Sequence, residues 1–181
     1  DEVGELGRHA VDMQRSLREL VEKDALTGLY NRRYGEKRLK QVQKDADSYG
    51  MPFCIAIGDI DYFKHVNDTY GHEWGDRVLT QIARIMAERM RREGYAARWG
   101  GEEFLLVFMD QGLQDAAETL RKLQNEIRDT EFTYNEKEKI RVTMTFGICE
   151  SSGGNTDELL RCADNRLYAG KKGGRDRIIQ E

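Results

Sequence analysis

The sequence predicts an α/β (α+β) fold: a central mixed or antiparallel sheet flanked by helices, with a separate helix at the N-terminus. After residue 50, apolar and amphipathic segments follow in the order strand, helix, strand, strand, helix, strand, helix. Hydrophobic residues make up 39% of the 181 residues, which is enough to build one core without a disulfide or a metal. A heptad pattern is confined to the first segment of the chain.

That first segment has the pattern of a coiled coil. Its apolar residues recur at alternating spacings of three and four, as at the a and d positions of heptads: Val3, Leu6, Ala10, Met13, Leu17 and Leu20. So narrow a stripe favours pairing with a second copy, although a single helix packed on its own domain would share the pattern. The sequence starts at Asp1 instead of methionine. We therefore expect residues 1–23 to be the end of a signalling helix whose upstream sensory region is missing, and residues 24–181 to form the domain proper.

The first half of the domain contains two amphipathic segments around one apolar segment. A charged helix is expected over 31–49, a buried strand over 51–57 and a second helix over 75–92. The residues in between, 63–76, are rich in Asn, Asp, His and Gly and predict a polar loop.

The next segment predicts a β-hairpin. Strands over 95–98 and 103–109 flank Gly100 and Gly101, and a Gly-Gly pair supplies the positive φ angles of a tight primed turn. The remainder predicts a helix over 113–129, a charged loop near 135–139, a strand over 140–149, a helix over 156–170 and a short strand over 177–179.

Charge and composition exclude several classes of function. The net charge is -4, so a broad basic face for a nucleic-acid polymer is not expected. No apolar run approaches the roughly 18 residues that span a membrane, so we expect no membrane contact by this segment and a cytoplasmic location, which is compatible with an anchor elsewhere in a longer protein. Cys54, Cys149 and Cys162 have no CxxC spacing and predict a reducing compartment, with neither a disulfide framework nor a zinc site.

Two acidic clusters lie at the ends of predicted strands. Asp59 and Asp61 come directly after the apolar strand, and Glu102 and Glu103 lie at the Gly-Gly turn. If the hairpin pairs with that strand, Asp59 and Glu102 converge from adjacent strand ends, where α/β sheets place ligands. Such a cluster repels itself unless a cation neutralises it, and oxygen ligands select Mg²⁺ or Mn²⁺. A solvated acidic turn explains any one of these residues equally well.

Polar and basic residues near these clusters suit a nucleotide. Asn67 and Asp76 can read the edge of a purine base, and Lys64 can meet phosphate. Taken singly, each residue of this segment has a structural explanation: Asp76 as a helix cap, Asn67 in an Asx turn and His72 as a surface residue. A second basic group follows the last helix and can either hold a polyphosphate or complement the helix dipole: Lys171, Lys172, Arg175 and Arg177.

These motifs, in this order, resemble the GGDEF family, the diguanylate cyclases of bacterial signalling. The signature stands here as the GGEEF variant over residues 100–104. Three further motifs resemble those of the family: DALTGLYNRR at 24–33, the run from Asp59 to Asp76, and the run from Tyr168 to Arg175. Together they span residues 24 to 178.

The resemblance implies a palm-like fold, as in nucleotide cyclases and polymerases, and one reaction. Two GTP molecules would condense to cyclic di-GMP with release of two pyrophosphates, across a homodimer formed by the N-terminal helix and the catalytic face. Asp59, Glu102 and the main-chain carbonyl of Ile60 would hold Mg²⁺, or Mn²⁺. Asn67 and Asp76 would read the guanine edge with His72 nearby, and Lys64, Lys171 and Arg175 would meet the phosphates. Phe63 would be a further substrate-binding residue. The proton acceptor would be Glu103 or metal-bound Glu102, with Lys64 stabilising developing charge.

One motif departs from the family pattern. Members with product inhibition carry an Arg-x-x-Asp pair upstream of the signature, and the matching residues here are Arg91 and Gly94. The resemblance therefore implies that feedback binding of cyclic di-GMP at this surface is weak or absent.

Three other functions compete with the cyclase. A receptor that has lost turnover would be expected to lack acids, but Asp59, Glu102 and Glu103 are all present. A cyclase for another nucleotide such as ATP is disfavoured, because a carboxylate such as Asp76 accepts from guanine N1–H and the 2-amino group, which adenine does not present. A purely structural dimerisation domain would leave the acidic clusters without a role.

Overall fold

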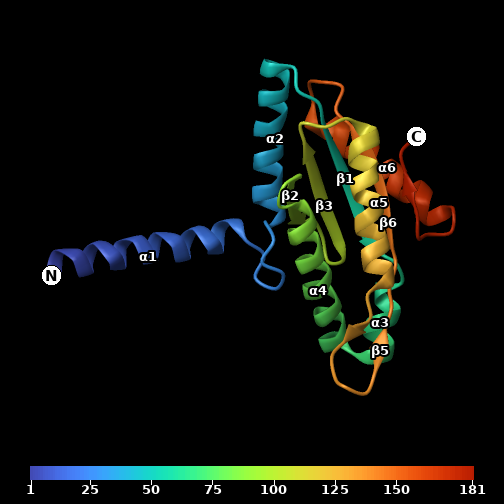
Figure 1. The fold of residues 1–181 in the computed structure, drawn as a ribbon, viewed down its shortest axis with the longest axis horizontal. Coiled ribbons are helices and arrows are strands. Elements are labelled where there is room, and N and C mark those ends of the chain that lie inside the picture. Colours follow the sequence, from blue (N-terminus) through green and yellow to red (C-terminus); the bar gives the residue numbers. More distant parts are fainter.

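A five-stranded mixed sheet forms the centre of the domain in a computed structural model that describes residues 1–181 (Figure 1). The strand order is β2-β3-β1-β6-β7, and all neighbours are antiparallel except β6 and β7. The predicted sheet and hairpin are confirmed. The strands are β1 (Phe53–Ile60), β2 (Gly94–Arg98), β3 (Glu103–Met109), β6 (Met144–Glu150) and β7 (Ile178–Ile179).

Helices cover both faces of this sheet. One face carries α2 (Arg32–Tyr49) and α6 (Thr156–Lys172), and the other carries α4 (His72–Met90) and α5 (Leu113–Asp129). The short helix α3 (Phe63–Tyr70) connects β1 to α4. A separate hairpin follows α5 and borders the charged loop expected near 135–139; its strands are β4 (Phe132–Thr133) and β5 (Lys139–Ile140).

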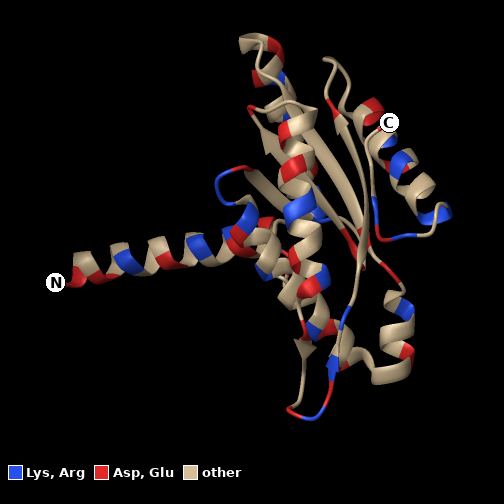
Figure 2. Cartoon of the chain, turned by 45° about the vertical axis from the view of Figure 1, so that its right-hand side comes forward, with Lys and Arg blue, Asp and Glu red and all other residues tan.

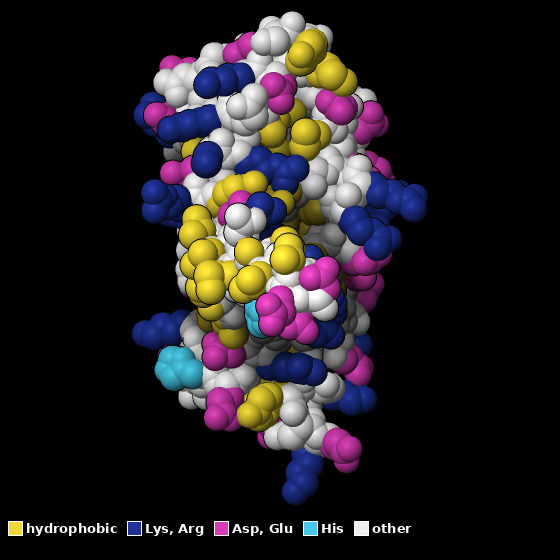
Figure 3. Space-filling view, turned by 90° about the vertical axis from the view of Figure 1, so that its left-hand side faces the viewer, with side chains coloured by type: hydrophobic (Ala, Val, Ile, Leu, Met, Phe, Trp, Pro, Cys, Tyr) yellow, Lys and Arg dark blue, Asp and Glu magenta, His cyan; other side chains and the backbone are white.

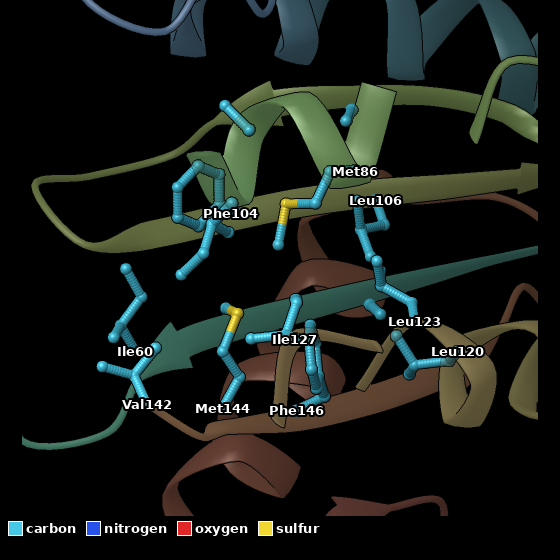
Figure 4. Close-up of a cluster of buried hydrophobic side chains, with 14 of the residues drawn as sticks. Ile60, Met86, Phe104, Leu106, Leu120, Leu123, Ile127, Val142, Met144 and Phe146 are labelled. Carbon is cyan, nitrogen blue, oxygen red and sulfur yellow. The ribbon is translucent and has the colours of Figure 1, made fainter. Parts of the chain in front are cut away.

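The central strand β1 is apolar on both faces because both are covered. Its residues alternate between two cores, with Cys54, Ala56 and Ile60 facing α4 and α5, and Ile55 and Ile57 facing α2 and α6. Figure 4 shows the first of these cores, in which side chains from the sheet meet those of the helices that cover it. The strand therefore reads as a continuous apolar run in the sequence.

The N-terminal helix α1 (Glu2–Glu22) extends away from the domain, and none of its residues is buried (Figure 1). Val3, Leu6 and Leu20 are 70–78% exposed. Figure 3, viewed from the side from which α1 projects, shows hydrophobic side chains open at the surface. The predicted helix is confirmed, and its pairing with a second copy stays a prediction. No helix of the chain combines the length and the apolar character needed to cross a membrane.

A disulfide between Cys149 and Cys162 contradicts the expectation that the cysteines form no such framework. Cys149 lies in β6 and Cys162 in α6, and the packing of this helix on this strand brings their Cα atoms to 6.5 Å, within the range for a disulfide. That proximity depends on tertiary packing, so sequence spacing carried no sign of it. Cys54 is free and buried, and burial, with Glu150 nearby, raises the pKa of its thiol to about 12.

Because of the disulfide, we expect the free energy of unfolding to depend on redox conditions. It closes a separation of 13 residues, so under oxidising conditions Cys162→Ser should lower the free energy of unfolding by about 3 kcal/mol. Urea denaturation measures the difference. The same comparison in excess dithiothreitol is the control, because the wild type then loses the bridge and the two proteins should coincide. An equal difference under both conditions would show that the effect comes from the serine.

Candidate active site

Three acidic residues of the two clusters, and Ile60 beside them, come together because the hairpin lies next to β1, as expected. The β1–β3 register places Asp59 directly opposite Glu103. One step further, the Ile60 N–H donates to the Glu102 carbonyl at 3.2 Å. Asp59, Ile60, Glu102 and Glu103 therefore lie side by side where the central strands end.

The carboxylate of Asp59 is mostly buried, which makes its charge unfavourable. Burial raises the pKa of Asp59 to about 6; the Lys171 ammonium, 2.5 Å from the carboxylate, opposes this rise, and Glu102 and Glu103 add to it. Figure 2 shows acidic segments at the ends of the central strands and basic segments in the chain after α6. A positive charge is thus already held against Asp59.

The donor set of this cluster suits a hard divalent cation. Asp59 and Glu102 supply carboxylate oxygens. The Ile60 carbonyl accepts no hydrogen bond from the Glu102 N–H, so it is free on that side. Oxygen-only ligands fit Mg²⁺ or Mn²⁺. No group of three or more metal-ligating side chains forms in the chain. Mg²⁺ commonly binds through one or two carboxylates, with water and substrate phosphates completing its shell, so the residues present fit that ion.

A second pocket adjoins the acidic one and holds the residues expected to read a base. Asn67 of α3 and His72 and Asp76 of α4 line it, together with Lys64 and Glu102. Phe63, Lys64 and Glu102 line both pockets, so the two are halves of one site.

The segment expected to be a loop over 63–76 is helical, and that expectation was wrong. Phe63, Val66 and Trp74 are buried in the core, which gives this polar stretch the apolar support a helix needs. Gly71, with φ of 96°, separates α3 from α4. Asp76 lies in the second turn of α4 and does not cap it, since the cap residue is Gly71.

Gly75 makes the base half of the site possible. A Cβ at this position would lie 1.9 Å from Oδ1 of Asn67 and 3.1 Å from the Phe63 ring. The absent side chain lets α3 pack against the first turns of α4 with the Asn67 amide between them. Asn67, His72 and Asp76 therefore depend on this glycine for their relative positions.

The basic residues of the C-terminal segment separate into two groups. Lys171 and Arg175 line the acidic half of the site, and the Arg175 guanidinium stacks on the Tyr62 ring at 4.8 Å. Lys172 instead lies over the ring of Tyr168, and neither it nor Arg177 lines a half of the site.

Asp61 has a structural role that sequence reasoning missed. Its buried carboxylate accepts hydrogen bonds from the hydroxyls of Thr143 and Thr145, at 2.7 and 2.6 Å, and from the Asp176 N–H at 3.0 Å. The last bond fixes the backbone next to Arg175, which has a left-handed φ of 64°. Asp61 thus holds the basic loop over the site, and its saturated carboxylate is not a ligand. The alternating Thr143 and Thr145 were the sequence signal for this role.

A family model described as diguanylate cyclase, GGDEF domain, matches residues 21–177. The chain belongs to this family. The response regulator PleD of Caulobacter vibrioides is 37% identical over 164 residues, covering 89% of this chain and 36% of PleD. The chain therefore spans about a third of the length of that curated relative.

Solved GGDEF structures agree with this assignment over almost the whole chain. The coiled coil and GGDEF domain of DgcB from Caulobacter crescentus, in complex with c-di-GMP, is 29% identical, with a TM-score of 0.91 covering 100% of this chain and 96% of that one. Diguanylate cyclase SiaD of Pseudomonas aeruginosa, in complex with its activator SiaC, is 35% identical, with a TM-score of 0.86 over 99% of this chain and 71% of SiaD. The similarity to DgcB includes α1 as well as the GGDEF domain.

The GGDEF signature turn is held by an arginine and not by left-handed glycines. Neither Gly100 nor Gly101 has a positive φ, which corrects the expectation of a primed turn. Instead, the Arg98 guanidinium donates to the Gly100 and Gly101 carbonyls, at 3.2 and 2.9 Å, and pairs with Asp24 at 3.2 Å. Burial opposes it, but hydrogen bonds from Thr27 and the charge of Arg98 hold the pKa of Asp24 below its ordinary value. Arg98 thus connects the loop after α1 to the signature turn of the GGDEF domain, a contact that sequence reasoning missed.

Because the pKa of Asp59 is raised, we expect its negative charge to destabilise the folded domain. The folded GGDEF domain holds this proton up to about pH 6, whereas the unfolded chain releases it near 3.8, so the charge destabilises the fold progressively as the pH rises between those values. In metal-free buffer, Asp59→Asn should melt at a higher temperature than the wild type near neutral pH, and the difference should shrink toward pH 4.

Thermal melts across that pH range measure this difference. Asp12→Asn in helix α1 is the matched control, because it changes an exposed aspartate that lies outside the site. A lower melting temperature for Asp59→Asn at neutral pH, or a difference that does not vary with pH, would contradict the prediction.

Proposed function

We propose that this domain condenses two GTP molecules into cyclic di-GMP and releases two pyrophosphates, with two copies of the chain each holding one GTP. The observation that carries the proposal is the continuity of the site, in which Lys64 and Glu102 border both the acidic half and the base half. DgcB, a relative over the full chain, was solved in complex with c-di-GMP, which supports the same product here.

In this proposal the base half selects guanine. The carboxylate of Asp76 accepts from N1–H and the 2-amino group, and the Asn67 amide pairs with a further edge of the base. His72 lies at the same pocket, and Phe63 forms its apolar border with the acidic half. Because adenine lacks these donors, the site should reject ATP by leaving Asp76 unpaired.

The acidic half binds the phosphates and supports the reaction. Lys64, Lys171 and Arg175 are the cations that neutralise the triphosphate. Asp59, Glu102 and the Ile60 carbonyl would hold Mg²⁺, with Mn²⁺ as an alternative. When bound, the ion polarises the α-phosphate and lowers the pKa of the attacking ribose 3′-hydroxyl.

Glu103, or Glu102, takes the proton of the ribose 3′-hydroxyl. The 3′-oxygen then forms a bond to the α-phosphorus of the other GTP. Pyrophosphate leaves from that phosphorus, so each of the two bonds formed releases one pyrophosphate. Lys64 stabilises the charge that develops on the phosphate oxygens. The chain thus acts mainly by position and charge, as phosphoryl transfer requires.

The reaction needs two sites to face one another, which assigns a role to α1. We infer that residues 1–23 pair as a parallel coiled coil and that residues 24–181 form the catalytic domain. Such pairing raises the effective concentration of one site for the other. An upstream sensory region would then act through the helix.

Product feedback at the surface of Arg91 is not expected. A Cβ at Gly94, where an inhibited cyclase carries aspartate, would lie 1.9 Å from the Val107 carbonyl. The close pairing of β2 with β3 leaves no room for that side chain.

The proposal predicts turnover that depends on the acidic cluster. Incubated with GTP and Mg²⁺, the purified chain should yield cyclic di-GMP and pyrophosphate, separated by chromatography. Asp59→Asn and Glu103→Gln should each lose roughly a hundredfold or more of the rate, the scale of a lost catalytic acid–base or charge contribution. Glu158→Gln, an exposed acid at the start of α6, is the control and should keep full activity. GTP binding without product, even with α1 fused to a strong dimeric zipper, would replace the cyclase with a nucleotide receptor.

The role of Gly75 predicts a separate loss of nucleotide affinity. Gly75→Ala displaces the Asn67 amide, so the Kd for GTP should rise roughly tenfold, as expected when one or two hydrogen bonds are lost. Isothermal titration calorimetry measures this Kd. The matched control is Gly7→Ala in α1, where nothing lies within 4 Å of the added methyl group. Unchanged GTP affinity in Gly75→Ala would remove Asn67 from the base half of the site.

A further inference from the structure

The first turns of α4 present two faces with different neighbours. His72, Asp76 and Leu79, at spacings of four and three, line the base half of the site. Glu73, Arg77 and Gln81, at spacings of four, form the neighbouring stripe and all contact the β4–β5 hairpin or the loop between its strands. The helix that would read the base is therefore held from a second side.

This end of α4 lacks the side-chain cap found at many helix starts. Its cap residue is Gly71, and no side chain accepts a hydrogen bond from the first free N–H groups. Helix ends without such a cap are prone to local opening. His72 is the first residue of the helix, and Asp76 follows one turn later, so opening would displace both of them.

Contacts from the hairpin compensate for the missing cap. The Tyr134 hydroxyl donates to the Glu73 carboxylate at 2.6 Å. The Thr133 carbonyl accepts from Arg77 Nε at 3.3 Å and from Gln81 Nε2 at 3.2 Å. Two consecutive residues of the hairpin thus bind three successive turns of α4.

A cluster of tilted aromatic rings adds to these hydrogen bonds. Trp74, only 4% exposed, contacts both Tyr70 and Tyr134, with ring centroids 5.5 and 5.9 Å away. Such pairs stabilise beyond the area they bury. The hairpin itself is fixed, because Phe132 and Ile140 are buried in the core beneath α4. Rigidity of the core is therefore carried through the hairpin to the first turn of α4.

We propose that the β4–β5 hairpin positions the base-reading turn of α4, residues 72–76, and that Tyr134 is the positioning residue through which it acts. This inference rests on the proposed function, since it assigns guanine recognition to that turn. Tyr134 lines neither half of the site, so its effect on substrate passes through Glu73 and Trp74.

Tyr134→Phe tests the proposal because it removes the hydroxyl and keeps the ring. KM for GTP should rise about fivefold with kcat unchanged, since the lost hydrogen bond loosens binding and not the chemistry. The preference for GTP over inosine triphosphate, which lacks the 2-amino group, should fall by a similar factor. The melting temperature should change by less than about 2 °C, as for other surface substitutions. Tyr49→Phe is the matched control, because that exposed tyrosine makes no hydrogen bond and lies outside both halves of the site.

Variants at Glu73 separate positioning from general stability. Glu73→Gln retains an oxygen that can accept from Tyr134 and should keep KM near the wild-type value, whereas Glu73→Ala should reproduce Tyr134→Phe. The double variant Glu73→Ala/Tyr134→Phe should be no worse than either single variant, because both remove the same hydrogen bond.

The outcomes distinguish this inference from the proposed function. Unchanged KM and unchanged nucleotide preference in Tyr134→Phe would overturn the positioning role. A variant in which kcat and the melting temperature both fall would also overturn it, because that result indicates a general loss of stability. If the wild type makes no cyclic di-GMP, the cyclase proposal fails. The hairpin is then judged by the Kd for GTP, measured by calorimetry, which must still rise in Tyr134→Phe and Glu73→Ala and stay constant in Tyr49→Phe.

Discussion

The register between β1 and β3 is the constraint on which the rest of the site depends. It sets Asp59 opposite Glu103 and lets Ile60 bond to Glu102, so the acidic residues of two distant segments meet. Side chains alternate along a strand, and a slip of one residue would send Asp59 into the α4–α5 core and bring Ile60 to the site. Both faces of β1 are buried, so such a slip would require both cores to repack. Hydrophobic packing therefore fixes the position of the charges.

Holding those charges is unfavourable, and the fold offsets the cost with contacts around them. Lys171 lies against Asp59, while Asp61 accepts hydrogen bonds from two hydroxyls and a backbone N–H and in turn fixes the loop of Arg175. The two aspartates are separated by one residue and point to the same side of the sheet. They differ in how many partners their carboxylates already have, and so in their capacity to bind a ligand. Asp61 is saturated by the protein, whereas Asp59 has a single partner that can exchange for another cation.

Much of the sheet and most helices follow from apolar periodicity, and the failures have physical causes. The polar segment 63–76 looked like a loop because its helices depend on Phe63, Val66 and Trp74 reaching a core that is distant in sequence. The Gly100-Gly101 pair indicated the right hairpin for the wrong reason, since carbonyl contacts to Arg98 and not left-handed φ angles shape the turn. Site candidates could be named from motifs. Their supporting contacts could not, because these join residues dozens of positions apart.

Those supporting contacts reach the site at two places, the signature turn and the first turns of α4. On the side of the signature turn, Arg98 links the Gly101 carbonyl to Asp24, which follows α1 directly. On the side of the base-reading turn, Tyr134 and Thr133 link α4 to a hairpin whose own strands are buried in the core. Arg98 and Gly101 both line the base half of the site, so the ion pair to Asp24 and the contacts of the hairpin support the same half from opposite ends. Glu102, the next residue of the signature turn, lines both halves, so the position of this turn bears on the acidic cluster as well.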